Sequence, residues 1–178
     1  MKNDCQTTNV MMTKLKKTNS KLIAPCGINC RLCRAHIRNI KACPGCRDDI
    51  FKSKSCVACL IKNCEKLING CFKYCFSCDE FPCAQISHLE KRYTSKYGVS
   101  VLHNLKEIQI NGIRAFVRNE NKKWICSNCG EIICMHKEQC ISCGHAWREW
   151  PKINIEYPYE ANSIARTSTA NICHLCFQ

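Results

Sequence analysis

The sequence predicts a small metal-stabilised fold of the irregular or α+β class, built from a cysteine-knuckle domain, a short helical hairpin and a zinc ribbon. Three observations predict it. The chain has 20 cysteines among 178 residues, a density typical of folds that are held together through cysteine sulfur. Most of these cysteines form Cys-x-x-Cys pairs. The longest stretch without cysteine has the apolar periodicity of helices.

The cysteines are better explained as metal ligands than as disulfide partners. The N-terminal sequence has no apolar run of the kind found in secretory signals, and no stretch approaches the ~20 apolar residues of a membrane span. We therefore expect a cytoplasmic protein without a membrane partner, and disulfides are rare in that compartment. A redox Cys-x-x-Cys motif occurs once, beside a βαβ pattern. Here the spacing recurs at 30/33, 43/46, 56/59, 75/78, 126/129, 140/143 and 173/176.

Metal binding changes what the charge of the chain implies. The formal net charge is +13 with every thiol counted as neutral. Cysteines that bind metal are thiolates, so a zinc site with four of them carries about −2. Four such sites would leave the protein at about +5. The formal charge alone is therefore a weak argument for nucleic-acid binding.

The first two predicted segments are a tail and a cysteine-rich domain. Residues 1–22 are polar and rich in lysine, which predicts a disordered basic tail. Residues 23–83 hold twelve cysteines and little apolar periodicity, so metal must supply much of the folding free energy. Twelve ligands would fill three four-ligand sites, but the sequence leaves open which cysteines share a metal. The predicted ligands are Cys26, Cys30, Cys33, Cys43, Cys46, Cys56, Cys59, Cys64, Cys71, Cys75, Cys78 and Cys83.

The next segment, residues 84–120, predicts two or three short helices. Apolar side chains recur there at intervals of three and four, as on one face of a helix. Gly98 is a plausible C-terminal stop, and Gly112 interrupts the periodicity of the following stretch. We expect this segment to form the only conventional apolar core of the chain.

Residues 121–150 have the pattern of a zinc ribbon. The predicted ligands are two Cys-x-x-Cys pairs ten residues apart, each followed by glycine, which permits the backbone to turn its amides toward the sulfurs. Short strand-forming stretches, 124–125 and 132–133, flank the first pair. The ligands are Cys126, Cys129, Cys140 and Cys143, and zinc is the expected metal. Cys134, His136 and His145 are further donors whose role the sequence leaves open.

Residues 151–178 predict a loosely attached C-terminal tail. Cys173 and Cys176 at its end could complete a site on the body of the protein or bind metal between chains. Their spacing could equally be an accident of a cysteine-rich tail. Cys5 has no local partner, which predicts a free thiol.

The metal of the twelve-cysteine domain stays open between zinc and a [4Fe-4S] cluster. The spacing Cys-x3-Cys-x2-Cys at 26/30/33 is used by radical-SAM enzymes, but a chain of this length has no room for their large barrel. The common hydrolase, nucleotide-binding and zinc-protease motifs are absent, which argues against an enzyme without excluding one.

The sequence favours a multi-metal module whose zinc sites are mainly structural and whose surface binds a protein or a nucleic acid. The alternative is an iron–sulfur protein for electron transfer or for redox or metal sensing.

Three blocks of this sequence resemble a family of cysteine-rich prokaryotic proteins known as domain of unknown function 3795. They are APCGINCRLC at 24–33, CPGCR at 43–47 and CFSCDEFPC at 75–83. The resemblance extends over roughly residues 23–146 and includes the ribbon pattern; Asn29 departs from the acidic residue typical of the first block. The resemblance implies metal binding and no particular activity.

Overall fold

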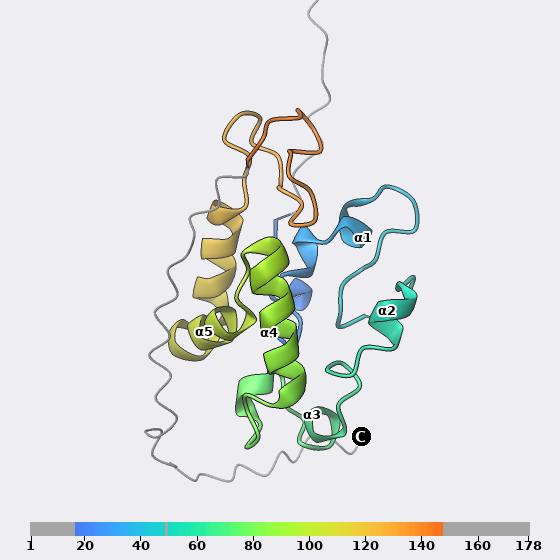
Figure 1. Cartoon of the computed structure of the whole chain (residues 1–178), viewed down its shortest axis with the longest axis vertical. Helices are drawn as coiled ribbons and strands as arrows, with labels where there is room; N and C mark the ends of the chain where they lie inside the picture. The colour runs from blue at the N-terminus through green and yellow to red at the C-terminus, as the bar shows by residue number, and fades with distance from the viewer. Residues whose placement is uncertain (1–16, 49, 148–178) are drawn as a thin grey trace, which may run out of the picture.

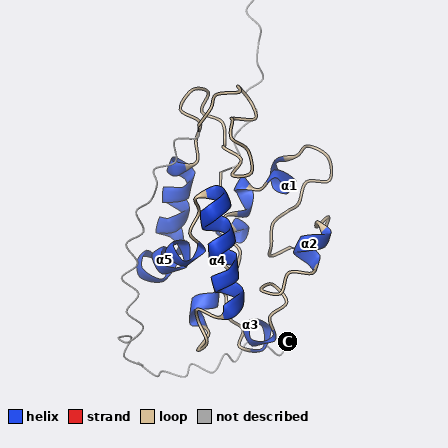
Figure 2. Cartoon of the chain, in the orientation of Figure 1, coloured by secondary structure: helices blue, strands red, loops and turns tan. Residues whose placement is uncertain are grey.

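The computed structural model describes residues 17–48 and 50–147, and the fold is taken from those residues (Figure 1). Cys5, the C-terminal tail predicted over 151–178, and Cys173 and Cys176 lie outside the described residues. Within them the regular structure is helical (Figure 2). Strand is limited there to isolated antiparallel bridges, which pair Ile23 with Asn29, Ile125 with Ile132 and Gln139 with Ala146. The β part of the predicted α+β class is therefore small.

Short helices form the cysteine-rich segment, and two long helices follow it. The short helices are η1 (Ser20–Leu22), η2 (Cys30–Leu32), α1 (Arg34–Ile37), α2 (Lys54–Val57), α3 (Glu65–Asn69) and η3 (Cys75–Ser77). The long helices are α4 (Ala84–Tyr97) and α5 (Val101–Lys123). In Figure 1, α4 runs through the centre with α5 on one side, and the 124–147 segment lies beyond the upper ends of both helices.

Local sequence explains the hairpin formed by α4 and α5. Helix α4 ends at Gly98, whose left-handed conformation (φ 61°) suits glycine. Ser100 then begins α5, because its hydroxyl accepts a hydrogen bond of 2.9 Å from the backbone N–H of His103. Gly112 interrupts α5 with φ 76° and ψ 158°, outside the helical region. Both helices and the interruption agree with the predicted helical segment, and α5 continues three residues past its predicted end at residue 120.

The apolar core is shared between the helices and the cysteine-rich segment, which corrects the expectation that the helices alone would form it. One cluster of buried side chains joins Leu105 and Phe116 of α5 to Ile23, Ile61 and Leu67. The apolar residues of the cysteine-rich segment have no regular spacing, so the sequence gives no sign that they converge. Because they pack on α5, burial of apolar surface stabilises this segment.

The end of the predicted N-terminal tail is ordered against α5. The backbone N–H of Thr18 donates to Asn121 Oδ1 at 2.8 Å, and Asn121 Nδ2 donates back to the carbonyl of Thr18 at 3.1 Å. Leu22 is buried and packs beside Gly45, where an added Cβ would lie 3.1 Å from Leu22 Cδ2. The boundary between tail and folded protein therefore lies before residue 18 rather than after residue 22.

Helix α5 also fixes the loop of residues 24–33, which carries three predicted ligands. Asn104 Nδ2 donates to the carbonyl of Gly27 at 3.0 Å, and Asn29 Nδ2 donates to Glu120 Oε2 at 2.9 Å. Gly27 has φ 81°, and a Cβ there would lie 3.0 Å from Leu105 Cγ. Only glycine combines this backbone conformation with so close an approach to the helix.

Glu120 is buried among these contacts, and burial disfavours its charged form. Its exposed fraction is 5%. Burial raises the pKa of Glu120, although the hydrogen bond from Asn29 and the charge of Lys123 act in the opposite direction. A carboxyl whose pKa is higher in the folded than in the unfolded protein stabilises the fold most when it is protonated. The stability that Glu120 contributes is therefore lost as the pH rises from the ordinary glutamate pKa through the raised one.

We predict that Glu120→Gln retains the stability of the wild type at neutral pH, while Glu120→Ala loses about 1–3 kcal/mol, because only alanine leaves the buried Asn29 amide without an acceptor. Urea unfolding measures both variants. The wild type should lose stability relative to Glu120→Gln as the pH rises through that window. Glu107→Gln is the matched control, since Glu107 accepts from Asn111 at an exposed position. Equal losses for Glu120→Gln and Glu120→Ala would contradict this account.

Candidate metal centre

The four predicted ribbon cysteines come together in the structure. Their sulfur atoms all lie within 4.8 Å of one another. The sulfurs of Cys126 and Cys143 are 3.7 Å apart, and those of Cys129 and Cys140 are 3.6 Å apart. Over residues 17–48 and 50–147 this is the one group of three or more histidine, cysteine or acidic side chains that meets so closely. These four cysteines could hold a metal ion.

Two turns of the same form carry the four sulfurs. In the first, Gly130 N–H donates to the carbonyl of Cys126 at 2.9 Å, and Cys126 N–H donates to the carbonyl of Glu131 at 2.8 Å. The second turn repeats both bonds at 2.9 Å, from Gly144 to Cys140 and from Cys140 to His145. Gly130 has φ 73° and Gly144 has φ 71°. These positive values let the backbone reverse direction directly after the second cysteine of each pair. The Cys-x-x-Cys-Gly spacing thus builds two matching halves of one site.

The four thiols differ in their surroundings. Cys126 and Cys140 are buried, whereas Cys129 and Cys143 are exposed. Hydrogen bonds from the Asn128 side chain and the His145 backbone lower the pKa of Cys143 to about 6. The hydrogen bond from the Glu131 backbone N–H lowers the pKa of Cys129. Desolvation and hydrogen bonds with the other three thiols raise it by more, so that the pKa of Cys129 is about 12. The surroundings of the two exposed thiols therefore act in opposite directions, and a bound metal would require the thiols that ligate it to be deprotonated.

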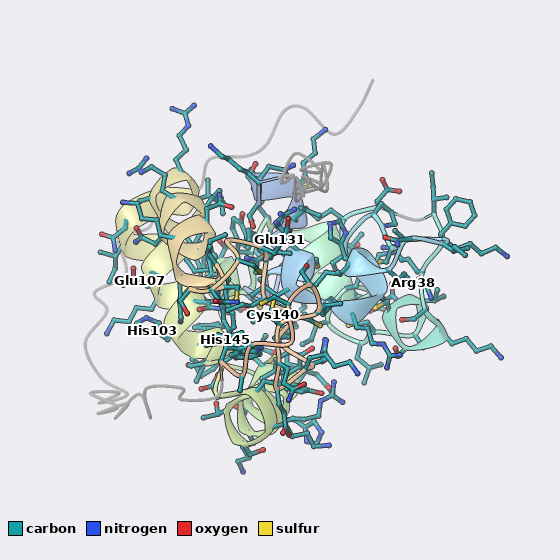
Figure 3. The ribbon with its side chains drawn as sticks, turned by 90° about the horizontal axis from the view of Figure 1, so that it is seen from above. Arg38, His103, Glu107, Glu131, Cys140 and His145 are labelled. Atoms are coloured by element: carbon teal, nitrogen blue, oxygen red, sulfur yellow. The ribbon has the colours of Figure 1, made fainter. Side chains whose placement is uncertain are left out.

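The three additional donors of this segment lie outside the four-sulfur group. Cys134 is fully buried. His136 Nδ1 accepts a hydrogen bond of 3.3 Å from the Arg34 backbone, and its ring meets the ring of Tyr97 edge-on at 4.8 Å. His145 Nε2 is 3.4 Å from the Ser127 hydroxyl. Seen from above in Figure 3, Cys140 and His145 of the 124–147 segment lie over the centre of the molecule.

The 124–147 segment is docked on the loop of residues 24–33. Met135 N–H donates to the carbonyl of Leu32 at 3.0 Å. A second apolar cluster surrounds this contact and includes Leu32, Val99, Trp124 and Met135. The four-sulfur group and the cysteine-rich segment are therefore joined through the backbone between Cys30 and Cys33.

The twelve cysteines of residues 23–83 are gathered more loosely. Seven of them contribute to or pack against the shared core: Cys26, Cys30, Cys46, Cys59, Cys64, Cys75 and Cys83. Cys43 is also buried, Cys33, Cys56 and Cys78 are half-buried, and Cys71 is exposed. No three of these sulfurs lie within 4.8 Å of one another. That these twelve bind metal therefore stays a prediction.

Sequence analysis missed the polar side chains that hold the ligand loops. Asn104 and Glu120 both fall on the apolar face of α5, three residues after Val101 and four after Phe116. A polar residue on an apolar stripe indicates a buried hydrogen bond and would have identified them. No such sequence pattern identifies Arg47. It donates to the carbonyls of Ile23 at 2.8 Å and Lys73 at 2.7 Å.

Comparisons with known proteins found no match to this chain. No protein-family profile matches it, no curated protein sequence matches it, and no solved structure matches it. None of the helices in the described residues has both the length and the apolar character needed to cross a bilayer. The resemblance to domain of unknown function 3795 is a hypothesis, and the function has to be argued from the site.

We predict that Cys129→Ser releases the 124–147 segment from the 24–33 loop, whereas Cys134→Ser leaves this segment docked. Only Cys129 belongs to the four-sulfur group. Hydrogen exchange followed by mass spectrometry measures this on peptides that contain Met135. Exchange should accelerate in Cys129→Ser and stay low in peptides from α4. The same acceleration in Cys134→Ser would contradict the assignment of four ligands.

Proposed function

We propose that Cys126, Cys129, Cys140 and Cys143 bind one zinc ion as the two turns of a zinc ribbon. The observation that carries this proposal is the spacing of the sulfurs. A tetrahedron with Zn–S bonds of about 2.3 Å has sulfurs about 3.8 Å apart. In the structure the sulfurs of Cys126 and Cys143 are 3.7 Å apart and those of Cys129 and Cys140 are 3.6 Å apart. The four cysteine sulfurs that hold a four-iron cluster each bind a different iron and have the cluster between them, so sulfurs this close together suit a single ion.

The zinc of this site has a structural role in our proposal. Four protein sulfurs complete the tetrahedron, and catalytic zinc normally keeps one position for water or substrate. The three other donors nearby, Cys134, His136 and His145, lie outside the group. Zinc would hold the two turns together and thereby keep Trp124 and Met135 packed on Leu32.

We predict that the full-length protein purified without chelator contains zinc, and that Cys143→Ser loses about one equivalent of it, because three thiolates bind zinc less tightly than four. Elemental analysis by mass spectrometry measures zinc per chain. Cys134→Ser is the matched control and should retain the wild-type content. Unchanged zinc in Cys143→Ser would contradict the site.

A basic stripe on α5 favours nucleic acid as the partner of this zinc-stabilised module. The stripe consists of Arg114, Arg118 and Lys122, which recur every four residues and are all exposed. Positions four apart on a helix lie about 6 Å apart along its axis. Within the described residues none of the three side chains makes an ion pair or hydrogen bond.

The same half of α5 exposes no negative charge that would oppose a phosphate backbone. Its single carboxylate, Glu120, is buried and points toward Asn29. At the end of the helix Lys123 lies over the ring of Trp124 at 5.4 Å, and Trp124 itself is buried. A row of cations that has no partner among residues 17–48 and 50–147 suits a polyanion better than an apolar protein surface. Binding nucleic acid through this stripe is therefore the function that we propose for the module.

We predict that replacing Arg114, Arg118 and Lys122 together by glutamine weakens binding to a fluorescent mixed-sequence single-stranded RNA at least tenfold at low salt. Three lost phosphate contacts should also reduce the slope of log affinity against log salt by about 2. Fluorescence anisotropy over a salt series measures both. A triple glutamine variant at the exposed Lys54, Lys91 and Lys96 is the charge-matched control. Binding that is absent in the wild type, or equally weakened in the control, would contradict the proposal.

A further inference from the structure

The first described segment of the chain is strongly basic. Residues 17–47 contain seven lysine and arginine residues and no aspartate or glutamate. Two of the seven, Lys17 and Lys21, lie at the start of this segment, and both are exposed. In the part of the chain that the structure describes, neither side chain makes an ion pair or a hydrogen bond. These two lysines therefore present positive charge to the solvent.

A pair of hydrogen bonds joins this segment to the end of the basic stripe. The backbone N–H of Thr18 donates to Asn121 Oδ1 at 2.8 Å, and Asn121 Nδ2 donates to the carbonyl of Thr18 at 3.1 Å. Lys17 directly precedes Thr18, and Lys122 of the stripe directly follows Asn121. Helix η1 also contacts α5, and Figure 3 shows η1 beside the second half of α5. The stripe and the N-terminal lysines therefore belong to neighbouring parts of the surface.

The backbone that carries the two lysines is held in place. Thr18 is 4% exposed and Leu22 is 8% exposed, so each lysine is followed by a buried residue. Between them Asn19 begins η1, because its side chain accepts a hydrogen bond of 2.9 Å from the backbone N–H of Lys21. The segment is thus packed on the protein while Lys17 and Lys21 extend outward.

The two neighbouring segments offer positive charge without exposed carboxylates or aromatic rings. Residues 17–22 contain no acidic or aromatic side chain, and residues 112–123 contain one of each, Glu120 and Phe116. Both of these side chains are buried. A nucleic-acid base has no ring to stack on in such a surface, whereas a phosphate group meets only cations. The surface therefore suits the backbone of a nucleic acid rather than its bases.

We infer that Lys17 and Lys21 extend the basic stripe of α5 into one surface that binds the phosphate backbone of a nucleic acid. The strand follows the stripe toward the end of α5 and continues onto the N-terminal segment, which Asn121 holds beside it. The inference rests on the proposed function, whose site it enlarges. It also assigns the part of the ligand that is recognised, so binding is independent of base sequence.

The test measures binding of the full-length chain to the fluorescent mixed-sequence RNA by anisotropy over a salt series. Lys17→Gln/Lys21→Gln should reduce the slope of log affinity against log salt by about 1.4, which corresponds to two phosphate contacts with a single strand. Lys54→Gln/Lys96→Gln removes two exposed lysines elsewhere and is the charge-matched control. A uridine homopolymer of the same length should bind the wild type as tightly as the mixed sequence.

A second variant removes the anchor of the segment without changing its charge. Asn121→Ala should weaken RNA binding, because Lys17 loses its fixed position beside Lys122. Asn111→Ala is the matched control on the same helix, since Asn111 donates to the exposed Glu107, and it should bind RNA as the wild type does. Urea unfolding of both variants shows that they are folded.

The outcomes separate this inference from the proposed function. A wild type that does not bind RNA would contradict both. Weaker binding after replacement of the stripe, with an unchanged salt slope in Lys17→Gln/Lys21→Gln, would overturn this inference alone. So would an equal loss in Lys54→Gln/Lys96→Gln, or a strong preference for the mixed sequence over the uridine homopolymer. Phosphate also occurs in lipid headgroups, and tighter binding to phosphatidylserine vesicles than to RNA would overturn the choice of ligand.

Discussion

The loop of residues 24–33 is the constraint on which the rest of the structure depends. It has to present Cys26, Cys30 and Cys33 while its own backbone is largely buried. Helix α5 holds the loop from one side. Its Asn104 and Glu120 make hydrogen bonds to the loop, and the helix approaches Gly27 closely. The 124–147 segment holds the loop from the other side, through the hydrogen bond from the Met135 N–H to the carbonyl of Leu32. Burying polar groups without partners is costly in free energy. The 24–33 loop therefore depends on both α5 and the 124–147 segment for its partners.

Local sequence patterns predicted the parts of this fold that depend on near neighbours. The periodicity of residues 84–120, Gly98 and Gly112 located α4, α5 and the break between the halves of α5. The Cys-x-x-Cys-Gly pairs located the four-sulfur group, because each pair and its glycine form a turn without help from distant residues. Contacts between distant residues were not predictable in this way. Ile23, Ile61 and Leu67 share a core with α5 although no period connects them.

The twelve-cysteine segment shows the same limit for the candidate sites. Its candidate ligands are evident from the sequence, but the arrangement of their sulfurs depends on contacts such as the hydrogen bond from the Cys46 N–H to the Cys30 sulfur. The chain uses one element, Cys-x-x-Cys, in two surroundings. In the 124–147 segment two glycine turns bring four sulfurs within 4.8 Å of one another, with two of the separations at 3.6 and 3.7 Å. In the cysteine-rich segment the pairs lie in or against a shared apolar core, and no three of their sulfurs come within 4.8 Å of one another.

X-ray absorption at the zinc edge of the full-length protein tests the central claim most directly. The account predicts zinc surrounded by four sulfurs at about 2.3 Å, with a spectrum that changes in Cys143→Ser and is unchanged in Cys134→Ser. A zinc shell that contains nitrogen or oxygen would show that His136, His145 or water is a ligand. That result, or a protein without zinc, would contradict the four-cysteine site.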